Sequence, residues 1–363
     1  MSGARPYRGH RYTDLAATGN LPLIATRSGC VFHPLCGVIG VGEGHAARKG
    51  ARRMAPNFII GGAPKCGTTT LHQVLDQHPD IWVARNEVYH FDADDPVAHG
   101  DFLKIEQGEL CWRDPNDPQV RAWYDARFAD APEGALIGED TTTYLMSAVA
   151  PARIKAANPE VKLIFMLRDP VKRAFSQYWH LLRSGRTSDS FEKTLTRHPS
   201  ILLGSTYAPA LREFRDVFGP EQVHVVIFED FNANRQAVLD GVTAFLGVSD
   251  LVRDDMPAWH NRTKYPAQMK TLLRLNRVGR VLVRARYARH LGQDRKLSAR
   301  LAHAAYRRWF GFVSRRVLTE DQPPSPMRAK TRAYLCQHLS DRNAGLSALI
   351  DKDLSRVWPG FSQ

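Results

Sequence analysis

The stretch GGAPKCGTTTL, residues 61–71, follows the short apolar run at 58–60. It nearly matches the loop of nucleoside triphosphate enzymes, in which Lys follows the last Gly and precedes Ser or Thr. Here Thr68 follows Gly67, and the only lysine, Lys65, lies two residues upstream of that glycine. A strand, a glycine turn and the start of a helix direct free backbone N–H groups and the helix dipole at an anion. The stretch therefore predicts a phosphate site whose lysine serves a different leaving group from that of a magnesium-bound triphosphate.

Strand and helix patterns alternate from residue 57 onward. The run VKLIFML at 161–167 is continuously apolar, as expected for a central parallel strand that is covered on both faces. Further strands are predicted at 58–60, 81–83, 136–138 and 223–228, and helices at 68–77, 117–130, 206–218 and 233–246, with another that opens at Pro170. This order predicts an α/β protein with a P-loop-containing nucleotide-binding fold, in which helices flank a central parallel sheet.

The two ends of the chain differ from this middle part. Residues 1–53 are rich in Gly and Arg and lack periodicity, which predicts a disordered N-terminal extension before a domain that spans 54–363. Within that domain, 262–330 is predicted to be a basic helical insertion. The tail at 332–358 is predicted to form an amphipathic helix.

The formal charge of +13 is concentrated in one segment. Between Arg262 and Arg316 there are 16 Lys or Arg residues and one acid, Asp294. Such a segment is either a solvated Arg-rich helical face or a surface for an anionic partner, which includes a polyanionic substrate, a nucleic acid and a lipid headgroup layer. The predicted helix near 272–287 carries Leu273, Val278, Val281 and Val283 beside many arginines and is suited to contact with an anionic membrane.

The cysteines and the apolar runs indicate in which cellular compartment the protein is expected. The five cysteines are scattered and odd in number, which indicates a reducing environment without a disulfide framework. No apolar run reaches transmembrane length, and no secretory signal is recognisable, so we expect a cytoplasmic protein, with peripheral membrane contact as a further option. Cys30, His33 and Cys36 lie close together but lack a fourth ligand, and no metal site is expected.

A second candidate phosphate motif is LRDPVKRAFSQY, residues 167–178. Arg168 follows the central apolar strand, at the edge where open parallel sheets bind ligands, and its guanidinium suits a phosphate. Ser176 lies eight residues further, inside the following helix. Two phosphate sites on neighbouring strands predict a nucleotide with phosphates at both ends of its ribose. The alternative is that Arg168 and Arg173 pair with nearby acids such as Asp169.

At this point the sequence resembles a known family. KCGTT at 65–69, together with Arg168, Asp169, Pro170 and Ser176, is similar to the two cofactor signatures of sulfotransferases, which use 3′-phosphoadenosine 5′-phosphosulfate (PAPS). The similarity is greatest to the heparan-sulfate (glycosaminoglycan) type. There NEVYHFD at 86–92 also matches, as do Gly138 and Glu139 with Thr141 and Tyr144. The resemblance covers roughly residues 57–265.

The resemblance implies a set of cofactor residues and a role for the lysine. Gly67, Thr68 and Thr69 would cradle the 5′-phosphate, and Arg168 with Ser176 would hold the 3′-phosphate. A late basic loop would close over the cofactor. The complete implied set is Lys65, Cys66, Gly67, Thr68, Thr69, Thr70, Arg168, Ser176, Arg262, Thr263 and Lys264. Lys65 would stabilise the negative charge that builds on the bridging oxygen during transfer, without a metal.

The candidate general base is Glu87, with His90 as its rival. A partly buried glutamate can have its pKa raised toward neutrality and accept a proton from the acceptor hydroxyl. Other branches of the family use a histidine, which needs less tuning. The structural alternatives are an ion pair of Glu87 with Arg85 and packing of His90 beside Phe91.

The acceptor is less defined by the sequence. Glu139 is expected to position the acceptor or the lysine, or to brace the loop. Asp140 stands where the glycosaminoglycan branch carries Lys, which counts against a heparan-like acceptor. We therefore expect a PAPS-dependent transfer to a hydroxyl or amine of a glycan, glycolipid or small metabolite, with no specific nucleic acid as partner. The alternatives are a P-loop kinase or nucleotide phosphatase, and a protein that binds anionic surfaces.

Overall fold

The computed structural model describes residues 55–99, 103–106, 109–251, 265–287, 297–321 and 326–361. The predicted extension at 1–53, with its Cys30–Cys36 group, and the closing-loop residues Arg262, Thr263 and Lys264 lie outside the described residues. The predicted domain boundaries at 53/54 and around 262–330 stay predictions.

A sheet of five parallel strands forms the centre of the fold. Its order is β2 (Ile81–Val83), β5 (Leu136–Asp140), β1 (Phe58–Gly62), β6 (Lys162–Leu167) and β7 (Val223–Ile227). Ile60 of β1 pairs with Asp140 of β5 on one side and Ile164 of β6 on the other, so the carboxyl ends of these three strands lie together. The predicted α/β fold with a central parallel sheet is confirmed.

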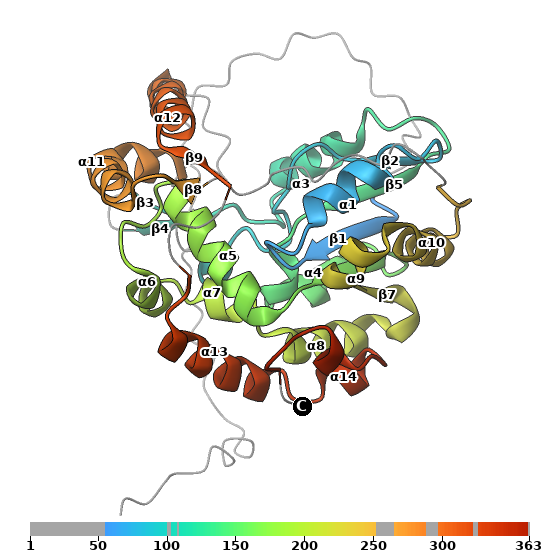
Figure 1. Cartoon of the computed structure of the whole chain (residues 1–363). Coiled ribbons are helices and arrows are strands. Elements are labelled where there is room, and N and C mark those ends of the chain that lie inside the picture. The colour runs from blue at the N-terminus through green and yellow to red at the C-terminus, as the bar shows by residue number, and fades with distance from the viewer. Residues whose placement is uncertain are drawn as a thin grey trace, which may run out of the picture. The chain divides into compact units, whose positions relative to one another are not determined.

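Helices cover both faces of the sheet (Figure 1). Apolar side chains at helical spacing pack α1 (Thr68–Leu75) and α10 (Arg235–Leu246) on one face, and α4 (Ala150–Ala157) and α8 (Tyr207–Phe218) on the other. The strands β1 and β6 between them are almost wholly buried, as their continuous apolar runs predict.

Helix α5 (Pro170–Arg183) begins where the sequence predicts it, directly after β6. Pro170 occupies the first turn, where its missing N–H costs nothing. The carboxylate of Asp169 caps the helix and accepts hydrogen bonds from Val171 N (2.9 Å) and Lys172 N (3.0 Å). The cap fixes the chain that links the end of β6 to α5, and with it the position of Arg168.

The C-terminal tail does not form the single helix predicted at 332–358. Helix α13 (Ala329–Arg342) ends before Asn343, whose side chain accepts from Tyr207 N (2.6 Å) and donates to Ser205 O (2.9 Å). Gly345 then adopts a left-handed backbone with φ 77°, and α14 (Leu346–Leu349) starts anew. The asparagine and the glycine end the helical pattern and bind the tail to α8.

Helices α11 (Met269–Tyr287) and α12 (Leu297–Arg316) confirm the predicted basic helical region and pack against each other (Figure 1). Both rest on the chain after α5. Asn276 donates to Leu182 O (2.7 Å) and Thr187 O (2.9 Å), and the ring of Trp309 lies against Gly279 and Gly185. None of the described helices combines the length and the apolar character that crossing a membrane requires.

Several shorter helices and strands, which the sequence patterns did not predict, lie between these elements. They are α2 (Pro96–His99), β3 (Lys104–Glu106), β4 (Glu109–Cys111), α6 (Phe191–Arg197), α7 (Ser200–Leu203), β8 (Tyr265–Pro266) and β9 (Leu318–Glu320). The helix predicted at 117–130 is α3 (Pro118–Asp125) followed by a 3-10 turn, and the one predicted at 233–246 is α10 preceded by α9 (Phe228–Ala233).

Candidate active site

The loop between β1 and α1 has the geometry of an anion site. Gly67 precedes α1 with φ 94°, a left-handed conformation that glycine adopts without strain, and no side chain caps this helix end. Thr68 and Thr70 are buried, whereas Thr69 is exposed. Thr70 N donates to Gly67 O (2.9 Å), whereas the N–H groups of Thr68 and Thr69 make no hydrogen bond to any described residue and remain available to a ligand at the carboxyl edge of the sheet.

Arg173 supports this loop through a hydrogen bond to its backbone. Its fully buried guanidinium donates to Pro64 O (3.0 Å) in the loop and to Ile201 O (3.0 Å) and Ser205 Oγ (3.2 Å) behind it. None of these partners is an acid, so the alternative in which Arg173 pairs with Asp169 is wrong. Burial lowers the pKa of Arg173, which shows how far its charge is removed from water.

Replacement of Arg173 by methionine tests this brace. The Arg173→Met protein should be less stable by about 1–3 kcal/mol, because two buried carbonyl oxygens lose their donor. Its affinity for 3′-phosphoadenosine 5′-phosphate (PAP) should fall as well. Thermal unfolding with and without PAP measures both effects, with Arg332→Met on the exposed face of α13 as the control. Unchanged stability and affinity would show that Pro64 does not need this support.

Arg168 contacts the loop at Lys65. Arg168 Nη1 donates to Lys65 O (3.4 Å), and the guanidinium lies over the Phe228 ring at 4.6 Å from its centroid. Lys65 has φ 70°, a conformation that a residue with a side chain rarely adopts and that occurs preferentially at functional sites. Burial lowers the pKa of Lys65 to about 8, and the positive charges of Arg183, Arg168 and Arg173 lower it further.

The residues around Lys65 fit a ligand that carries phosphates. Their mutual repulsion, visible in the lowered pKa of Lys65, would be relieved by an anion bound between them. Arg168 Nε is buried and has no partner in the described chain. Ser176 lies two turns into α5, partly buried, and its hydroxyl makes no hydrogen bond to any described residue. Their predicted role in binding a phosphate stays a prediction.

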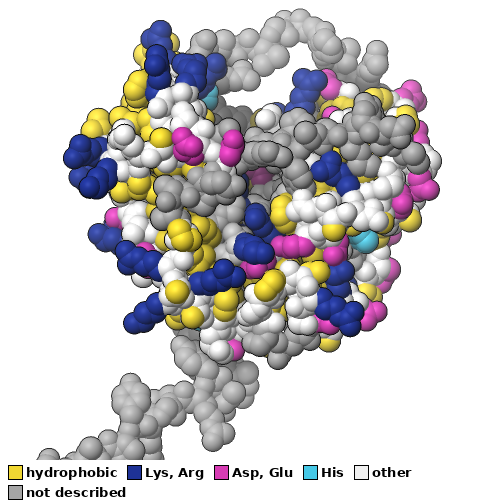
Figure 2. All heavy atoms as spheres, in the orientation of Figure 1, with side chains coloured by type: hydrophobic (Ala, Val, Ile, Leu, Met, Phe, Trp, Pro, Cys, Tyr) yellow, Lys and Arg dark blue, Asp and Glu magenta, His cyan; other side chains and the backbone are white. Residues whose placement is uncertain are grey.

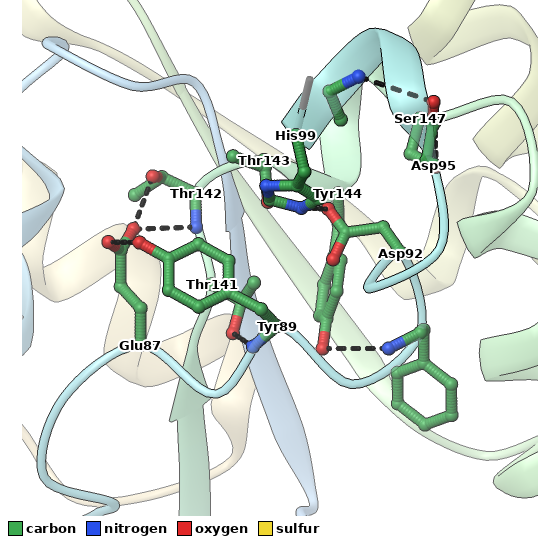
Figure 3. A network of polar contacts seen from close by, with 12 residues as sticks. Glu87, Tyr89, Asp92, Asp95, His99, Thr141, Thr142, Thr143, Tyr144 and Ser147 are labelled. Atoms are coloured by element: carbon green, nitrogen blue, oxygen red, sulfur yellow. Dashed lines mark hydrogen bonds and ion pairs between the residues drawn. The ribbon is translucent and has the colours of Figure 1, made fainter. Parts of the chain in front are cut away.

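Glu87 lies in the segment that follows β2, beside the end of β5 (Figure 3). Tyr89 Oη donates to one carboxylate oxygen, and Thr142 donates to the other from its N (3.2 Å) and its Oγ1. Arg85 is exposed and is not among these partners, so the surface ion pair is wrong. Burial, followed by the nearby negative charge of Asp140, raises the pKa of Glu87 above its ordinary value.

Glu139 braces the segment that carries the candidate base. Its fully buried carboxylate accepts from Tyr124 Oη (2.6 Å), Tyr144 Oη (2.6 Å) and Thr141 Oγ1 (2.8 Å). Thr141 Oγ1 in turn accepts from Val88 N (3.1 Å), and Tyr144 Oη accepts from His90 N (3.1 Å). These contacts agree with a structural role for Glu139, in which its carboxylate supports the segment that contains Val88 and His90.

His90 packs in the interior rather than beside the lysine. Its ring stacks on Tyr124 with centroids 4.1 Å apart and meets Phe91 edge-on. The ring lines a cavity together with Pro56 and Val161, which precede β1 and β6 at the opposite end of the sheet. Burial lowers the pKa of His90 to about 3, so the ring is neutral. These contacts agree with the packing role of His90, whereas the assignment of the base to Glu87 stays a prediction.

The acid that replaces the expected lysine is held in place by a histidine. Asp140 is buried at the end of β5, and its carboxylate is 3.1 Å from His72 Nδ1 of α1. Its charge contributes to the raised pKa of Glu87. The end of β5 beside Glu87 thus carries a second acidic side chain.

Comparisons with known proteins agree with this geometry. A model of the sulfotransferase family matches residues 56–252. The chain belongs to the sulfotransferase family. It is 29% identical over 221 residues to heparan sulfate glucosamine 3-O-sulfotransferase 3A1 of Mus musculus, a match that covers 58% of this chain and 50% of that protein. Carbohydrate sulfotransferase 15 of Mus musculus is 26% identical over 301 residues, which cover 68% of this chain and 53% of that protein.

A solved structure extends the similarity to the fold. The sulfotransferase from Alicyclobacillus acidocaldarius is 26% identical, with a TM-score of 0.53, and the match covers 84% of this chain and 98% of that one. The chain spans about half the length of the curated relatives described above. The predicted resemblance to sulfotransferases is confirmed, whereas the roles of individual site residues stay predictions.

Three residues of this sulfotransferase site were given no role by the sequence reasoning. Tyr89 lies within the NEVYHFD motif, but only the structure shows that its hydroxyl reaches Glu87. Thr142 follows the matched Gly-Glu pair and supplies two donors to the same carboxylate. Arg183 follows Ser176 by seven residues, a helical spacing that would have placed both on one face of α5.

Tyr89→Phe should move the acid limb of the pH profile of kcat to higher pH. The hydroxyl stabilises the ionised form of Glu87, so its removal raises the pKa of the carboxyl group. A base must be deprotonated to act, and the loss of activity should therefore be larger near about pH 6 than near about pH 8. A pH series of kcat, with Tyr334→Phe on α13 as the control, measures this. A uniform loss at every pH would assign Tyr89 a purely structural role.

Proposed function

We propose that this protein transfers the sulfuryl group of PAPS to a hydroxyl of a carbohydrate-containing acceptor, with Glu87 as the general base. An amine of such an acceptor is the alternative nucleophile. The observation that supports this most directly is the convergence of Glu87, Lys65 and Arg168 at one edge of the sheet. The negative charge of Glu87 raises the pKa of Lys65 against the effect of burial, which supports the nearness of the two groups.

The loop and α5 would bind the two phosphates of the nucleotide. The N–H groups at the start of α1 and the hydroxyls of Thr68 and Thr69 suit the 5′-phosphate. The guanidinium of Arg168 and the hydroxyl of Ser176 suit the 3′-phosphate. PAPS supplies an activated sulfuryl group, and the protein contributes position and charge.

Lys65 would act on the leaving oxygen. Negative charge develops there as the bond to sulfur breaks, and a preorganised ammonium group lowers the energy of that charge. With a pKa of about 8, Lys65 is largely protonated at neutral pH, and the bound anion would favour its protonated form further.

Glu87 would remove the proton of the acceptor hydroxyl. Three hydrogen bonds fix its carboxylate, and its raised pKa brings its basicity closer to neutral pH. The acid Asp140 beside it would disfavour an acceptor with a sulfate or carboxylate at that point. A neutral sugar hydroxyl is therefore the acceptor group that the site fits best.

Ligand-dependent unfolding tests the nucleotide part of this proposal. PAP without magnesium, at about a hundredfold excess over its Kd, should stabilise the protein by about 2.7 kcal/mol and raise its Tm, whereas ATP with magnesium should not. Arg168→Ala should abolish the shift, and Lys330→Ala on α13 should retain it. Stabilisation by ATP with magnesium alone would instead support the kinase or nucleotide phosphatase alternative.

The acceptor part needs a separate assay. The protein is incubated with PAPS labelled in its sulfuryl group and with neutral oligosaccharides, glycolipids or heparan sulfate as parallel acceptors. Labelling of neutral acceptors, and of desulfated more than sulfated heparan, is expected. Preferential labelling of the highly sulfated chains would contradict the role given to Asp140.

A further inference from the structure

Helices α11 and α12 are basic throughout and contain no acid. Their sequences carry eleven Lys or Arg residues in 39 positions and neither Asp nor Glu. Figure 2 shows Lys and Arg side chains gathered over these two helices, with hydrophobic side chains between them. In the part of the chain that the structure describes, none of Lys270, Arg274, Arg277, Arg308 and Arg315 forms an ion pair. The surface therefore carries an uncompensated positive charge.

The two faces of α11 have opposite character. Leu272, Asn276, Gly279 and Val283 face the protein at helical spacing. The other face is exposed, and there Val278 (84% exposed) and Val281 (75% exposed) stand between Lys270, Arg274 and Arg277. An aliphatic pair exposed to this extent contributes nothing to the core of the protein.

Helix α12 repeats this arrangement among those of its side chains that the structure describes. Val313 and Trp309 face the protein, whereas Leu297 (69% exposed), Leu301 (62%) and Phe312 (50%) follow one another along the outer face. Arg308 and Arg315 lie on the same face at spacings of three or four residues. Since both helices pack on the chain after α5, both outer faces point away from the body of the protein.

We propose that the outer faces of α11 and α12 dock the protein on an anionic lipid bilayer. A basic helix with aliphatic and aromatic side chains on its exposed side binds in the plane of a membrane interface. The apolar groups enter the headgroup–acyl boundary, and the cations pair with anionic headgroups. A sulfated polysaccharide would use the arginines but would leave five exposed apolar side chains without a partner. The combination of both kinds of side chain favours the lipid surface.

The helices of the docking surface rest on the end of α5, which also bears on the candidate active site. Both helices contact residues 182–187 at the end of α5, and Arg183 from that end lowers the pKa of Lys65. This inference does not depend on the proposed chemistry, because it concerns binding alone.

Vesicle flotation of the full chain tests the proposal. Vesicles of phosphatidylcholine with about 30% phosphatidylglycerol should bind the protein, and vesicles of pure phosphatidylcholine should bind it at least about tenfold less. The apolar variant carries Val278→Gln, Val281→Gln, Leu301→Gln and Phe312→Gln. It should lose at least about tenfold in affinity for the anionic vesicles. Glutamine has a helix propensity similar to that of the residues it replaces, so the helices should persist.

A charge variant and two matched controls separate the contributions. Arg274→Glu, Arg277→Glu and Arg308→Glu together should abolish vesicle binding and also retention on heparin. The controls are Val97→Gln with Val149→Gln, and Lys330→Glu with Arg332→Glu, which change exposed residues elsewhere and should bind like the parent protein. Thermal unfolding of every variant, with and without PAP, reports whether the fold and the nucleotide site persist.

Two results would overturn the proposal. The first is an apolar variant that is folded and binds anionic vesicles as well as the parent protein, which would leave a purely electrostatic surface. The second is a parent protein that is retained on heparin but does not float with anionic vesicles. That result would assign the surface to a polyanion such as a sulfated glycan. Failure of PAP to stabilise the protein would contradict the proposed sulfotransferase activity but not the docking surface.

Discussion

Lys65→Ala is expected to lower kcat by about a hundred- to a thousandfold, the cost of removing one preorganised group that stabilises a developing negative charge. The side chain lies in the β1–α1 loop among the cations Arg168, Arg173 and Arg183, where burial lowers its pKa to about 8. Its loss should affect the transition state more than the ground state. Steady-state kinetics with PAPS and a fixed acceptor, together with the Kd for PAP, separate the two effects.

The same lysine predicts an alkaline limit of activity. Because its pKa in the protein without ligand is lowered to about 8, the protonated form is lost as the pH rises through that value. The value of kcat/KM for PAPS should therefore decline above about pH 8, and this decline should be absent in Lys65→Ala. Lys330→Ala on α13 is the matched control and should keep both the rate and the limit. A Lys65→Ala protein with near-normal kcat would remove the lysine from the mechanism.

Glu87→Gln is expected to lower kcat by about a hundred- to ten-thousandfold, the usual contribution of a general base. The substitution keeps the size of the side chain and its contact with Thr142, so the Kd for PAP should stay unchanged. In the parent protein the acid limb of kcat should lie above the ordinary pKa of glutamate, because burial and Asp140 raise the pKa of Glu87. The carboxyl group gives up its proton as the pH rises through that pKa, and activity rises with it.

Two further variants distinguish the loss of a general base at Glu87 from other effects of a substitution. Glu192→Gln changes an acid on α6 and should leave the kinetics unaltered. His90→Gln probes the rival base, whose neutral ring stacks on Tyr124 in the interior, and should cost stability rather than the chemical step. A fully active Glu87→Gln protein together with an inactive but folded His90→Gln protein would transfer the role of the base to the histidine.

The sequence predicts the parts of this protein that depend on short-range patterns. The continuous run at 161–167 predicts β6, and Asp169 with Pro170 predicts the start of α5, because a buried strand and a capped helix each follow from neighbouring residues. The cofactor motifs could be placed because Lys65 and Arg168 each follow a strand of the same parallel sheet.

Other features depend on partners that are distant in the sequence and could not be predicted. The sequence allows an ion pair of Arg173 with Asp169. The observed partners, Ile201 and Ser205, come from a segment about 30 residues away. Tyr124 reaches Glu139 only because α3 packs on β5, whereas the other two donors, Thr141 and Tyr144, lie within five residues of Glu139. The break of the C-terminal helix similarly requires the contact of Asn343 with α8.

The two buried charges beneath the site have a consequence for divergence within the family. Arg173 supports the nucleotide loop and Glu139 supports the base segment, and among the described residues the two share no hydrogen-bond partner. The nucleotide loop and the segment of Glu87 are therefore supported by separate sets of hydrogen bonds. Under the proposed function, substitutions around Glu139 would change which acceptors are used while the nucleotide half stays intact, so new specificities would arise without a new donor.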